Sequence, residues 1–494
     1  MQVNSEKAFV NMIWKFCERF GLQMVTFIVS IVLARILSPE EYGIVTIVLV
    51  LLSIADVFVT GGFGNALIQK KNVDELDFSS VFYFNIVFSS FVYIIFYLIA
   101  PFIADFYDMP LLCELIRVLS LRLLLSGINS IQNAYISITM QFKKLFLSSC
   151  IGCVISSVIG IYMALHGYGA WSIVGQYLSS SLVNTIMLFA IIKWRPHKCF
   201  SFTRLKLLIR YGWKLMCSSF LDTVYQEIRS LLIGKVYSSE ELAYFDKANQ
   251  YPKLLANNIN VSISSVLFPI ISSEQDNLSR VKHMTRLAIQ VSSFVVWPAM
   301  VGLAVTSETW VLLLLSEKWL PSVPYVIIAC VVYAMIPINV ANLEAIKAIG
   351  RSDVYFILEI IKKAINIVAL FAVMNQGVYM IAIMAIPTGF LGLIINSYPN
   401  TKFLSYSICE QVMDVLPNIL ISCIMGLVVY LCGLINIELW LRFFIQICVG
   451  VIAYVVFALI FRNSSFKYLV RILKKLLHKN IITIKDDKNG ENII

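Results

Sequence analysis

The chain has 494 residues, of which 59% are hydrophobic and 14% are charged, and its mean hydropathy is +0.82. A soluble domain carries about 25% charged residues, so the composition excludes a water-soluble globular protein. The formal net charge is +10, but the cations gather in alternate connections between apolar runs. That placement indicates orientation in a membrane and excludes nucleic acid as a partner.

Long apolar runs dominate the chain. A run needs about 20 residues to cross the hydrocarbon core, and the sequence contains about fourteen such runs. We therefore predict an all-α polytopic membrane protein whose first span is retained, because no cleavage pattern follows it. The approximate bounds of the spans are 10–37, 42–65, 80–103, 112–138, 145–165, 169–193, 212–236, 248–272, 286–307, 322–345, 354–375, 377–398, 414–434 and 439–461.

Two distant stretches share one pattern. Ile31–Gly43 reads IVLARILSPEEYG, and Leu231–Ala243 reads LLIGKVYSSEELA. In each, an apolar run ends near one cation and a Ser-x-Glu-Glu turn follows. Such an internal repeat is typical of two-lobed transporters with a substrate site between the lobes. Because six predicted spans separate the turns, both turns should lie on the same face of the membrane.

The cations are divided unevenly between the connections. With the N-terminus in the cytosol, the even-numbered connections hold most of them, and the 194–210 segment alone holds five. The odd-numbered 104–111 connection holds Asp105 and Asp108 and no cation. This positive-inside pattern predicts a multi-pass protein of the plasma (inner) membrane with both termini in the cytosol.

Two cytosolic segments combine an apolar stripe with cations. Within 202–209 the stripe is formed by Phe202, Leu205, Leu208 and Ile209. In the tail it is formed by Phe466, Leu469, Leu473, Leu476 and Leu477. Such helices lie on anionic leaflets, so we expect anionic membrane lipids as partners.

Polar stripes inside the apolar spans identify the candidate site. An ionisable side chain at mid-bilayer costs about 2.5–3.5 kcal/mol on insertion scales and usually faces a bundle interior or a wet cavity. Cations exceed acids in these stripes, which predicts a cationic cavity for an anion, and the guanidinium fork suits phosphate. The cationic candidates are Lys15, Arg19, Arg117, Arg122, Arg229 and Lys253; the polar candidates are Asn129, Asn133, Gln226, Asn257 and Asn260.

Interhelical hydrogen bonding is the alternative explanation of the stripes. It accounts for single Ser and Thr residues and some Asn residues. It accounts poorly for an excess of cations, because packing contacts should pair charge with charge. Asp56, Asp222 and Glu227 are candidates for ion coupling, or else structural partners of a nearby Arg or Lys.

Enzymatic motifs are missing from the sequence. The four histidines have no metal-ligand spacing, and there is no P-loop. We therefore expect no metal, no cofactor and no catalytic residue, and we predict that the protein is not an enzyme. A membrane glycosyltransferase or polymerase should carry a sizeable external loop, and these connections are too short.

Seven short segments, in order along residues 5–460, carry a family resemblance. Together they resemble the polysaccharide-transport (O-antigen/teichuronic-acid type) flippase branch of the multidrug/oligosaccharidyl-lipid/polysaccharide exporter superfamily. The segments are Glu18–Gly21, Ala34–Gly43, Gly62–Gln69, Lys193–Pro196, Leu267–Pro269, Glu317–Pro321 and Ala348–Asp353.

The resemblance implies two six-helix lobes in a V-shaped arrangement with two further helices. The implied parts are an N-terminal lobe at 1–193, a cytosolic amphipathic linker at 194–210, a C-terminal lobe at 211–400, spans 13 and 14 at 401–462, and a basic cytosolic tail at 463–494.

The resemblance also implies an activity. It is the flipping of polyprenyl-pyrophosphate-linked oligosaccharide repeat units to the outer leaflet, for lipopolysaccharide or exopolysaccharide export in a bacterium. The pyrophosphate would meet Arg19, Arg122, Arg229 and Lys253, the glycan would meet the Asn residues, and polysaccharide polymerase machinery is a further expected partner. The leading alternative is a multidrug antiporter of the same superfamily, which needs an acidic, aromatic-lined pocket for organic cations.

Overall fold

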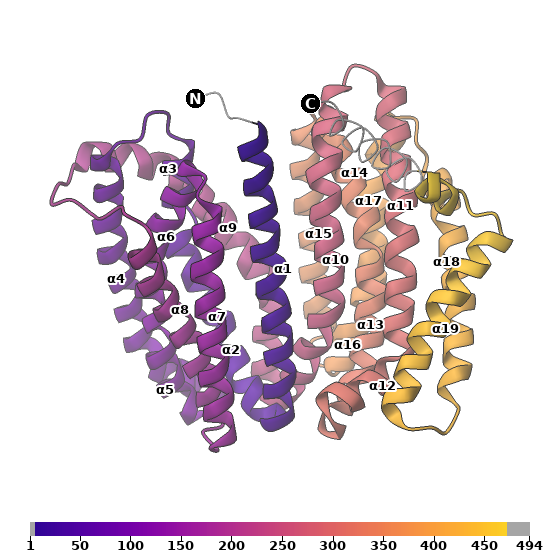
Figure 1. The fold of residues 1–494 in the computed structure, drawn as a ribbon, viewed down its shortest axis with the longest axis horizontal. Helices are drawn as coiled ribbons and strands as arrows, with labels where there is room; N and C mark the ends of the chain where they lie inside the picture. The colour runs from indigo at the N-terminus through magenta and orange to yellow at the C-terminus, as the bar shows by residue number, and fades with distance from the viewer. Residues whose placement is uncertain (1–4, 472–494) are drawn as a thin grey trace, which may run out of the picture. The chain divides into compact units, whose positions relative to one another are not determined.

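A computed structural model describes the backbone of residues 5–471 and the side chains of Trp14, of residues 21–265 and of residues 267–471. Every regular element in this part of the chain is a helix (Figure 1). Helices suit a chain of apolar spans because each satisfies its own backbone hydrogen bonds in lipid. The chain forms two compact units that divide between Asp246 and Lys247, called unit 1 and unit 2 below.

Unit 1 consists of the first nine helices and the start of the tenth. These are α1 (Ser5–Ile36), α2 (Pro39–Thr60), α3 (Phe63–Gln69), α4 (Glu75–Tyr107), α5 (Pro110–Leu119), α6 (Leu121–Thr139), α7 (Phe142–Leu165), α8 (Trp171–Ile191), α9 (Phe202–Val236) and α10 (Ser239–Ser273).

Unit 2 contains the rest of α10 and the helices that follow. These are α11 (Leu278–Val305), α12 (Ser307–Trp310), a π-helical turn (Val311–Leu315), a 3-10 helix (Glu317–Ser322), α13 (Val323–Ala334), α14 (Ile336–Ala348), α15 (Ser352–Val373), α16 (Val378–Ile383), α17 (Ala385–Phe403), α18 (Ile408–Gly433) and α19 (Leu439–Ile460).

Ten segments of the described chain are long and apolar enough to cross a membrane. The all-helical, multi-pass architecture predicted from the sequence is therefore confirmed. The other four predicted spans correspond to α1, α5 with α6, α9 and α15, which carry most of the ionisable residues found inside spans. Charged residues lower the mean hydropathy of these four segments below that of a typical membrane span. The predicted count of fourteen spans therefore stays a prediction.

The two repeated turns pack against each other within unit 1. Ser38 and Glu41 form a capping box at the start of α2, and the Glu241 N–H donates to Ser238 Oγ over 3.1 Å at the start of α10. A Cβ atom on Gly43 would lie 1.7 Å from the Ser239 carbonyl oxygen. Only glycine permits this backbone approach, and both turns consequently lie at one end of the unit.

A second close approach holds the other end of α9. A Cβ atom on Gly62, just before α3, would lie 2.4 Å from the Gly212 carbonyl oxygen. Helix α9 therefore packs against α2, α3 and α4 in unit 1. The predicted lobe boundary at 194–210 stays a prediction. The boundary after Asp246 separates units by their contacts, and the parts that move during transport need not be the same units.

The segment before α9 is attached along the start of α4. Its contacts are hydrogen bonds from the Trp194 indole to Glu75 (2.7 Å), from the His197 N–H to Ser79 Oγ (3.0 Å) and from the Ser201 N–H to Ser80 Oγ (2.9 Å). The segment is thus held against unit 1 over most of its length.

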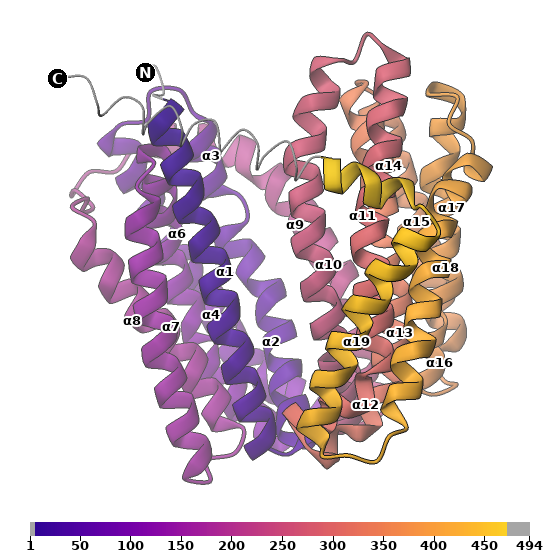
Figure 2. The same cartoon turned by 45° about the vertical axis from the view of Figure 1, so that its right-hand side comes forward.

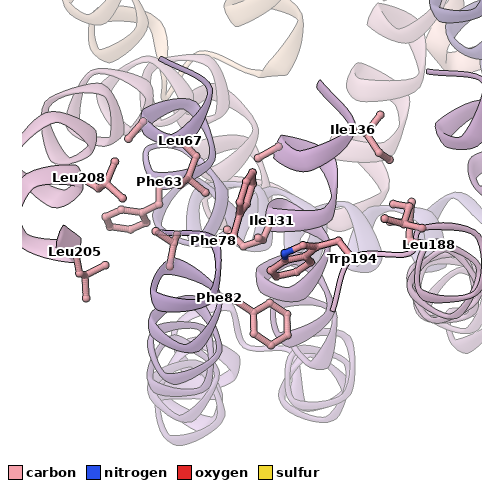
Figure 3. Close-up of a cluster of buried hydrophobic side chains, with 14 residues drawn as sticks. Phe63, Leu67, Phe78, Phe82, Ile131, Ile136, Leu188, Trp194, Leu205 and Leu208 are labelled. Atoms are coloured by element: carbon pink, nitrogen blue, oxygen red, sulfur yellow. The ribbon is translucent and has the colours of Figure 1, made fainter. Parts of the chain in front are cut away.

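The apolar stripe at the start of α9 faces the protein. Leu205 and Leu208 are 2% and 5% exposed and belong to a buried cluster with Phe63 and Phe78 (Figure 3). Phe202 is 68% exposed. The expectation of a helix lying on lipid by this stripe was therefore wrong for Leu205 and Leu208, because the same periodicity serves a protein core.

A group of charged residues outside the spans, called the charge clip below, strengthens the attachment of this segment to α4. Its members are Lys70, Asp74, Asp77 and Arg204. The Arg204 guanidinium hydrogen-bonds Asp74, the N-cap of α4, and lies 3.7 Å from an Asp77 oxygen. The Arg204 hydrogen bond, followed by the backbone N–H of Asp77, lowers the pKa of Asp74 from 3.8 to about 2. Lys70 approaches the buried Asp77 carboxylate to 2.5 Å from the other side.

In unit 2, α18 lies beside α11 and α19 lies beside α18 (Figure 2). The Tyr454 hydroxyl of α19 donates to the Phe294 carbonyl of α11 over 2.7 Å. Phe466 and Leu469, from the predicted tail stripe, pack partly buried against the same apolar cluster. Leu473, Leu476 and Leu477 lie outside the described residues.

Candidate functional site

A polar cavity of about 620 Å³ lies within unit 1. It is lined by residues of α1, α2, α3, α6, α7 and α8. Its hydroxyl-bearing, amide and charged lining residues are Thr26, Asp56, Thr60, Asn65, Arg122, Ser126, Asn129, Ser130, Asn133, Ser137, Ser149, Ser180, Ser181 and Asn184. No aromatic side chain is among the lining residues described, so the cavity suits polar ligands.

Helix α6 supplies the stripe predicted from the sequence. Arg122, Ser126, Asn129 and Asn133 recur at helical spacing and all line the cavity. Ile131, on the opposite face of α6, is buried in an apolar cluster with Phe78 and Phe82 of α4. The polar face of α6 therefore lines the cavity, although its role in binding stays a prediction.

The formal charges of the described lining residues cancel. Arg122 and Asp56 are the charged residues among its described lining residues. The Arg122 guanidinium lies 5.5 Å from the centre of the Tyr177 ring of α8. No ion pair joins Arg122 to Asp56 in the described chain. The described lining of the cavity thus carries no net formal charge. The side chains of Lys15 and Arg19 lie outside the described residues, so the cationic site stays a prediction.

Several buried oxygens of this cavity have no hydrogen-bond partner. They are the Oδ1 atoms of Asp56, Asn129, Asn133 and Asn184. Asn129 is only 8% exposed. Buried polar atoms in native proteins are nearly always satisfied, and these four acceptors are open to a donor that enters the cavity.

Three of the other predicted cations, Arg117, Arg229 and Lys253, are not among the described lining residues. Arg117 is not among the lining residues, since its guanidinium stacks 4.6 Å from the Tyr97 ring centre and Nε donates to the Tyr97 carbonyl over 3.3 Å. Arg229 belongs to unit 1 and Lys253, which is exposed, to unit 2. The side chains of Lys15 and Arg19 lie outside the described residues.

The remaining candidates sit on α9 and α10. Gln226 donates to the Asp222 carboxylate one turn earlier, over 2.9 Å, so this acid has an intrahelical partner. Glu227 also lies on α9 and has an interaction partner. In unit 2, Asn257 is exposed and Asn260 is half-buried.

Two polar clusters in unit 2 were not predicted from the sequence. On α15, Lys362 pairs with Glu359 over 2.5 Å inside a predicted span. At the start of α18, the buried Asp414 accepts from Arg286 and Gln290 (both 2.7 Å) and from the Tyr406 hydroxyl (2.8 Å). Arg286 and Gln290 are four residues apart, so their spacing in the sequence places both on one face of a helix.

Buried amides extend the second cluster. The Asn342 amide donates to Gln411 over 2.8 Å and its oxygen accepts from Asn400 over 2.6 Å. We call the contacts of Asp414 and Asn342 the unit 2 network. Both of these side chains are bonded on several sides, so the network holds α11, α14, α17 and α18 together.

Comparison with known proteins places the chain among polysaccharide-export proteins. The sequence model of the family described as "Polysaccharide biosynthesis protein" matches residues 32–324. The succinoglycan biosynthesis transport protein ExoT of Rhizobium meliloti is 24% identical over 72% of each chain. The teichuronic acid biosynthesis protein TuaB of Bacillus subtilis is 23% identical over 81% of this chain and 84% of its own.

Solved structures show the same fold. The lipid II flippase MurJ, in an inward closed conformation, superposes with a TM-score of 0.75 at 20% identity, covering 93% of this chain and 100% of MurJ. An inward-facing multidrug resistance transporter of the MATE family reaches 0.61 at 15% identity, covering 78% of this chain and 96% of its own. At these identities the likeness concerns architecture alone.

Proposed function

Because the chain belongs to the polysaccharide biosynthesis protein family, we propose that it flips polyprenyl-pyrophosphate-linked oligosaccharide repeat units from the cytosolic to the outer leaflet. The names of the relatives support this proposal, since they belong to transport and biosynthesis proteins of surface polysaccharides. The shared fold with a lipid II flippase supports it at the level of architecture.

The observation that carries the proposal is the unit 1 cavity. It joins one guanidinium with many hydroxyl and amide groups inside a helical membrane unit. A guanidinium can bond two phosphate oxygens at once, and hydroxyl and amide groups match the donors and acceptors of sugars. Arg122 therefore serves the pyrophosphate, and Asn129, Asn133 and Asn184 serve the glycan, while the lipid tail stays in the bilayer.

The complete anion site draws on further cations in this proposal. In unit 1 these are Lys15, Arg19 and Arg229, with Gln226 as a polar contact. In unit 2, Lys253, Asn257 and Asn260 are the candidates for contact with the substrate. Arg117 is left out, because its guanidinium is already engaged by Tyr97. Asp56 on α2 and Asp222 and Glu227 on α9 remain candidates for ion coupling.

We assign the protein to the inner membrane with both termini in the cytosol. The uneven distribution of cations supports this orientation. Anionic lipids then meet the exposed cations that flank the start of α9, and polysaccharide polymerase machinery receives the flipped unit. The transport cycle involves no covalent step, so the protein is not an enzyme.

The rival activities fit the cavity less well. A multidrug antiporter needs an acidic, aromatic-lined pocket, whereas the described lining of this cavity has no aromatic side chain and balances its one acid with Arg122. A membrane glycosyltransferase or polymerase would turn over a sugar donor. Assays of sugar-nucleotide turnover and organic-cation export with purified protein separate these activities from flipping.

Complementation of a bacterial strain that lacks its flippase tests the proposal. Arg122→Ala should abolish most export of surface glycan, and Arg122→Lys should restore part of it because a point charge replaces a bidentate fork. Arg117→Ala is the matched control, since it removes an arginine five residues away that lies outside the cavity. Membrane levels of each variant must be measured alongside. Full export by Arg122→Ala at normal protein levels would contradict the proposal.

A further inference from the structure

Helices α18 and α19 of unit 2 carry a group of polar side chains that the proposed function does not use. We propose that Glu438, Arg442 and Gln446, at the start of α19, bind the headgroup of an aminophospholipid, whose phosphate meets Arg442 and whose ammonium group meets Glu438. The proposal rests on the proposed function only in the orientation that places the α18–α19 connection at the outer leaflet.

Arg442 is a cation inside a candidate membrane span, and the described chain supplies no counter-ion for it. It is the fourth residue of α19, which spans Leu439–Ile460. Its guanidinium takes part in none of the ion pairs of the described residues, and its buried Nε has no hydrogen-bond partner among them. An intramembrane cation normally faces a partner, a wet cavity or a ligand. We therefore expect an anion at this place.

Two nitrogen donors converge beside Gly433 at the end of α18. A Cβ atom on this glycine would lie 2.6 Å from Gln446 Nε2 and 3.5 Å from Arg442 Nη2. Gln446 is 2% exposed, and its buried Oε1 has no hydrogen-bond partner in the described chain. A water molecule between Gln446 Oε1 and the Arg442 Nε–H would satisfy both buried atoms, since the two residues lie one turn apart on α19. The Nη groups of the half-buried Arg442 then stay available for a phosphate.

The nearest acidic residue in the sequence does not neutralise Arg442. Glu438 precedes Arg442 by four residues, a spacing at which a carboxylate and a guanidinium commonly pair on a helix. Its Oε2 accepts instead from the Trp440 indole over 2.5 Å, and no ion pair joins it to Arg442 in the described chain. The exposed carboxylate and the half-buried guanidinium are therefore two separate charges, about 6 Å apart along the helix axis at a rise of about 1.5 Å per residue.

The order of these two charges selects the ligand. Arg442 lies inside α19, whereas Glu438 caps the start of the helix and lies nearer to water. In an aminophospholipid the phosphate lies next to the glycerol, and the ammonium group lies nearer to water. A simple anionic lipid would satisfy Arg442 but would place no cation at Glu438. Trp440 is 60% exposed, as is usual for an indole at the membrane interface, and so places this end of α19 at the depth of the headgroups.

The distribution of cations around α19 indicates which leaflet supplies the lipid. The segment after the other end of α19 carries Arg462, Lys467 and Arg471. The 434–438 connection carries no cation. By the positive-inside rule, the cationic end lies in the cytosol and the connection lies outside. The aminophospholipid therefore belongs to the outer leaflet.

The test uses purified full-length protein in detergent, to which phospholipids with identical acyl chains are added. Native mass spectrometry counts the bound lipid, and the thermal midpoint reports stabilisation of the native state. Phosphatidylglycerol lacks the ammonium group, and the quaternary ammonium of phosphatidylcholine cannot donate a hydrogen bond to Glu438. We expect saturable binding of phosphatidylethanolamine with a Kd about tenfold below those of the other two lipids. Equal binding of all three would overturn the site, because the protein would then carry only an unselective belt of lipid.

Variants test the two charges separately. Arg442→Gln and Glu438→Gln should each raise the Kd of phosphatidylethanolamine about tenfold, since each removes one charge-assisted contact. Arg462→Gln is the matched control, because it removes an exposed arginine just beyond the other end of α19. Combining Glu438→Arg with Arg442→Glu keeps an i, i+4 pair but reverses the order of the charges, so it should abolish the preference. An unchanged preference in this double variant or in Glu438→Gln would overturn the site.

The outcomes separate this proposal from the proposed function. If the protein restores glycan export in the complemented strain but binds phosphatidylethanolamine no better than the other lipids, the site is wrong and the flippase stands. If Arg442→Gln weakens binding of a polyprenyl phosphate and leaves that of phosphatidylethanolamine unchanged, the guanidinium serves another lipid phosphate and the aminophospholipid site is likewise wrong. Selective binding of phosphatidylethanolamine without flipping would support the site and contradict the function.

Discussion

The two units use similar polar residues in different ways. In unit 1, the oxygens of Asn129 and Asn133 line a cavity and have no hydrogen-bond partners, and the backbone packs closely at Gly43 and Gly62. In unit 2, Asn342 is bonded to two neighbouring helices through its amide. A buried amide can therefore mark a binding cavity or hold helices together, and only its partners distinguish the two.

The largest effect is expected from packing in unit 1. Gly43→Ala places a Cβ atom 1.7 Å from the Ser239 carbonyl oxygen, so the repeated turns must separate. Overpacking usually costs about 1–3 kcal/mol, and a backbone atom cannot move aside as a side chain does, so we expect about 3 kcal/mol. The thermal midpoint of purified protein measures the loss.

Gly302→Ala in unit 2 is the matched control. Its Cβ atom would meet nothing nearer than Met425 Cε at 4.0 Å. This helical alanine should be neutral or stabilise by up to about 1 kcal/mol. Equal midpoints for the two variants would show that close backbone packing does not hold unit 1.

The second effect tests the charged part of the unit 2 network. Asp414→Ala removes the acceptor of Arg286, Gln290 and Tyr406. Breaking a buried pair costs about 3–5 kcal/mol, but Arg286 is 44% exposed, so we expect about 2–3 kcal/mol. A midpoint matching that of the wild type would indicate that water replaces Asp414 without cost.

The third prediction compares one substitution in the two units. Asn342→Leu leaves Gln411 and Asn400 without their partner and should cost about 2 kcal/mol. Asn129→Leu removes an oxygen that has no partner, so it should leave stability unchanged or raise it slightly while lowering glycan export. Chemical denaturation and complementation measure the two quantities. A greater loss of stability in Asn129→Leu than in Asn342→Leu would contradict the different roles assigned to buried amides in the two units.

The smallest effect concerns pH and the clip outside the spans. The folded-state pKa of Asp74 is about 2, below its ordinary value of 3.8, mainly because Arg204 bonds the carboxylate. A lowered acid pKa stabilises the fold above 3.8, and this contribution is lost as the pH falls from 3.8 through about 2. The difference in thermal midpoint between wild type and Arg204→Gln should be constant above pH 4 and close as the pH approaches 2. A difference that persisted at pH 2 would assign the role of Arg204 to packing.

The helical spacing of polar residues on the fourth predicted span was enough to predict the polar face of α6, although the single predicted span 112–138 forms two helices, α5 and α6. Arg122, Ser126, Asn129 and Asn133 share a face by periodicity alone, and the structure places that face on a cavity. Asn184 and Asp56, from other spans, complete the same lining. No spacing rule joins them to α6, because their proximity depends on how α2, α6 and α8 pack.

The stripe at the start of α9 illustrates the opposite case. Its periodicity was recognised, but its environment was assigned to lipid, whereas Leu205 and Leu208 pack on Phe63 and Phe78. Periodicity reports which residues share a face. It does not report whether protein or lipid covers the face, because both are apolar.

By itself the sequence determined the class of molecule, its helical spans and the repeated turns, since these follow from hydropathy and local spacing. The tertiary structure alone decided that the two turns approach each other at Gly43, that the Arg117 guanidinium stacks on Tyr97, and that Asp56 and Asn184 line the same cavity as Arg122. Burial and pairing of a polar group depend on which helices pack around it. Such contacts between distant residues leave no local pattern in the chain.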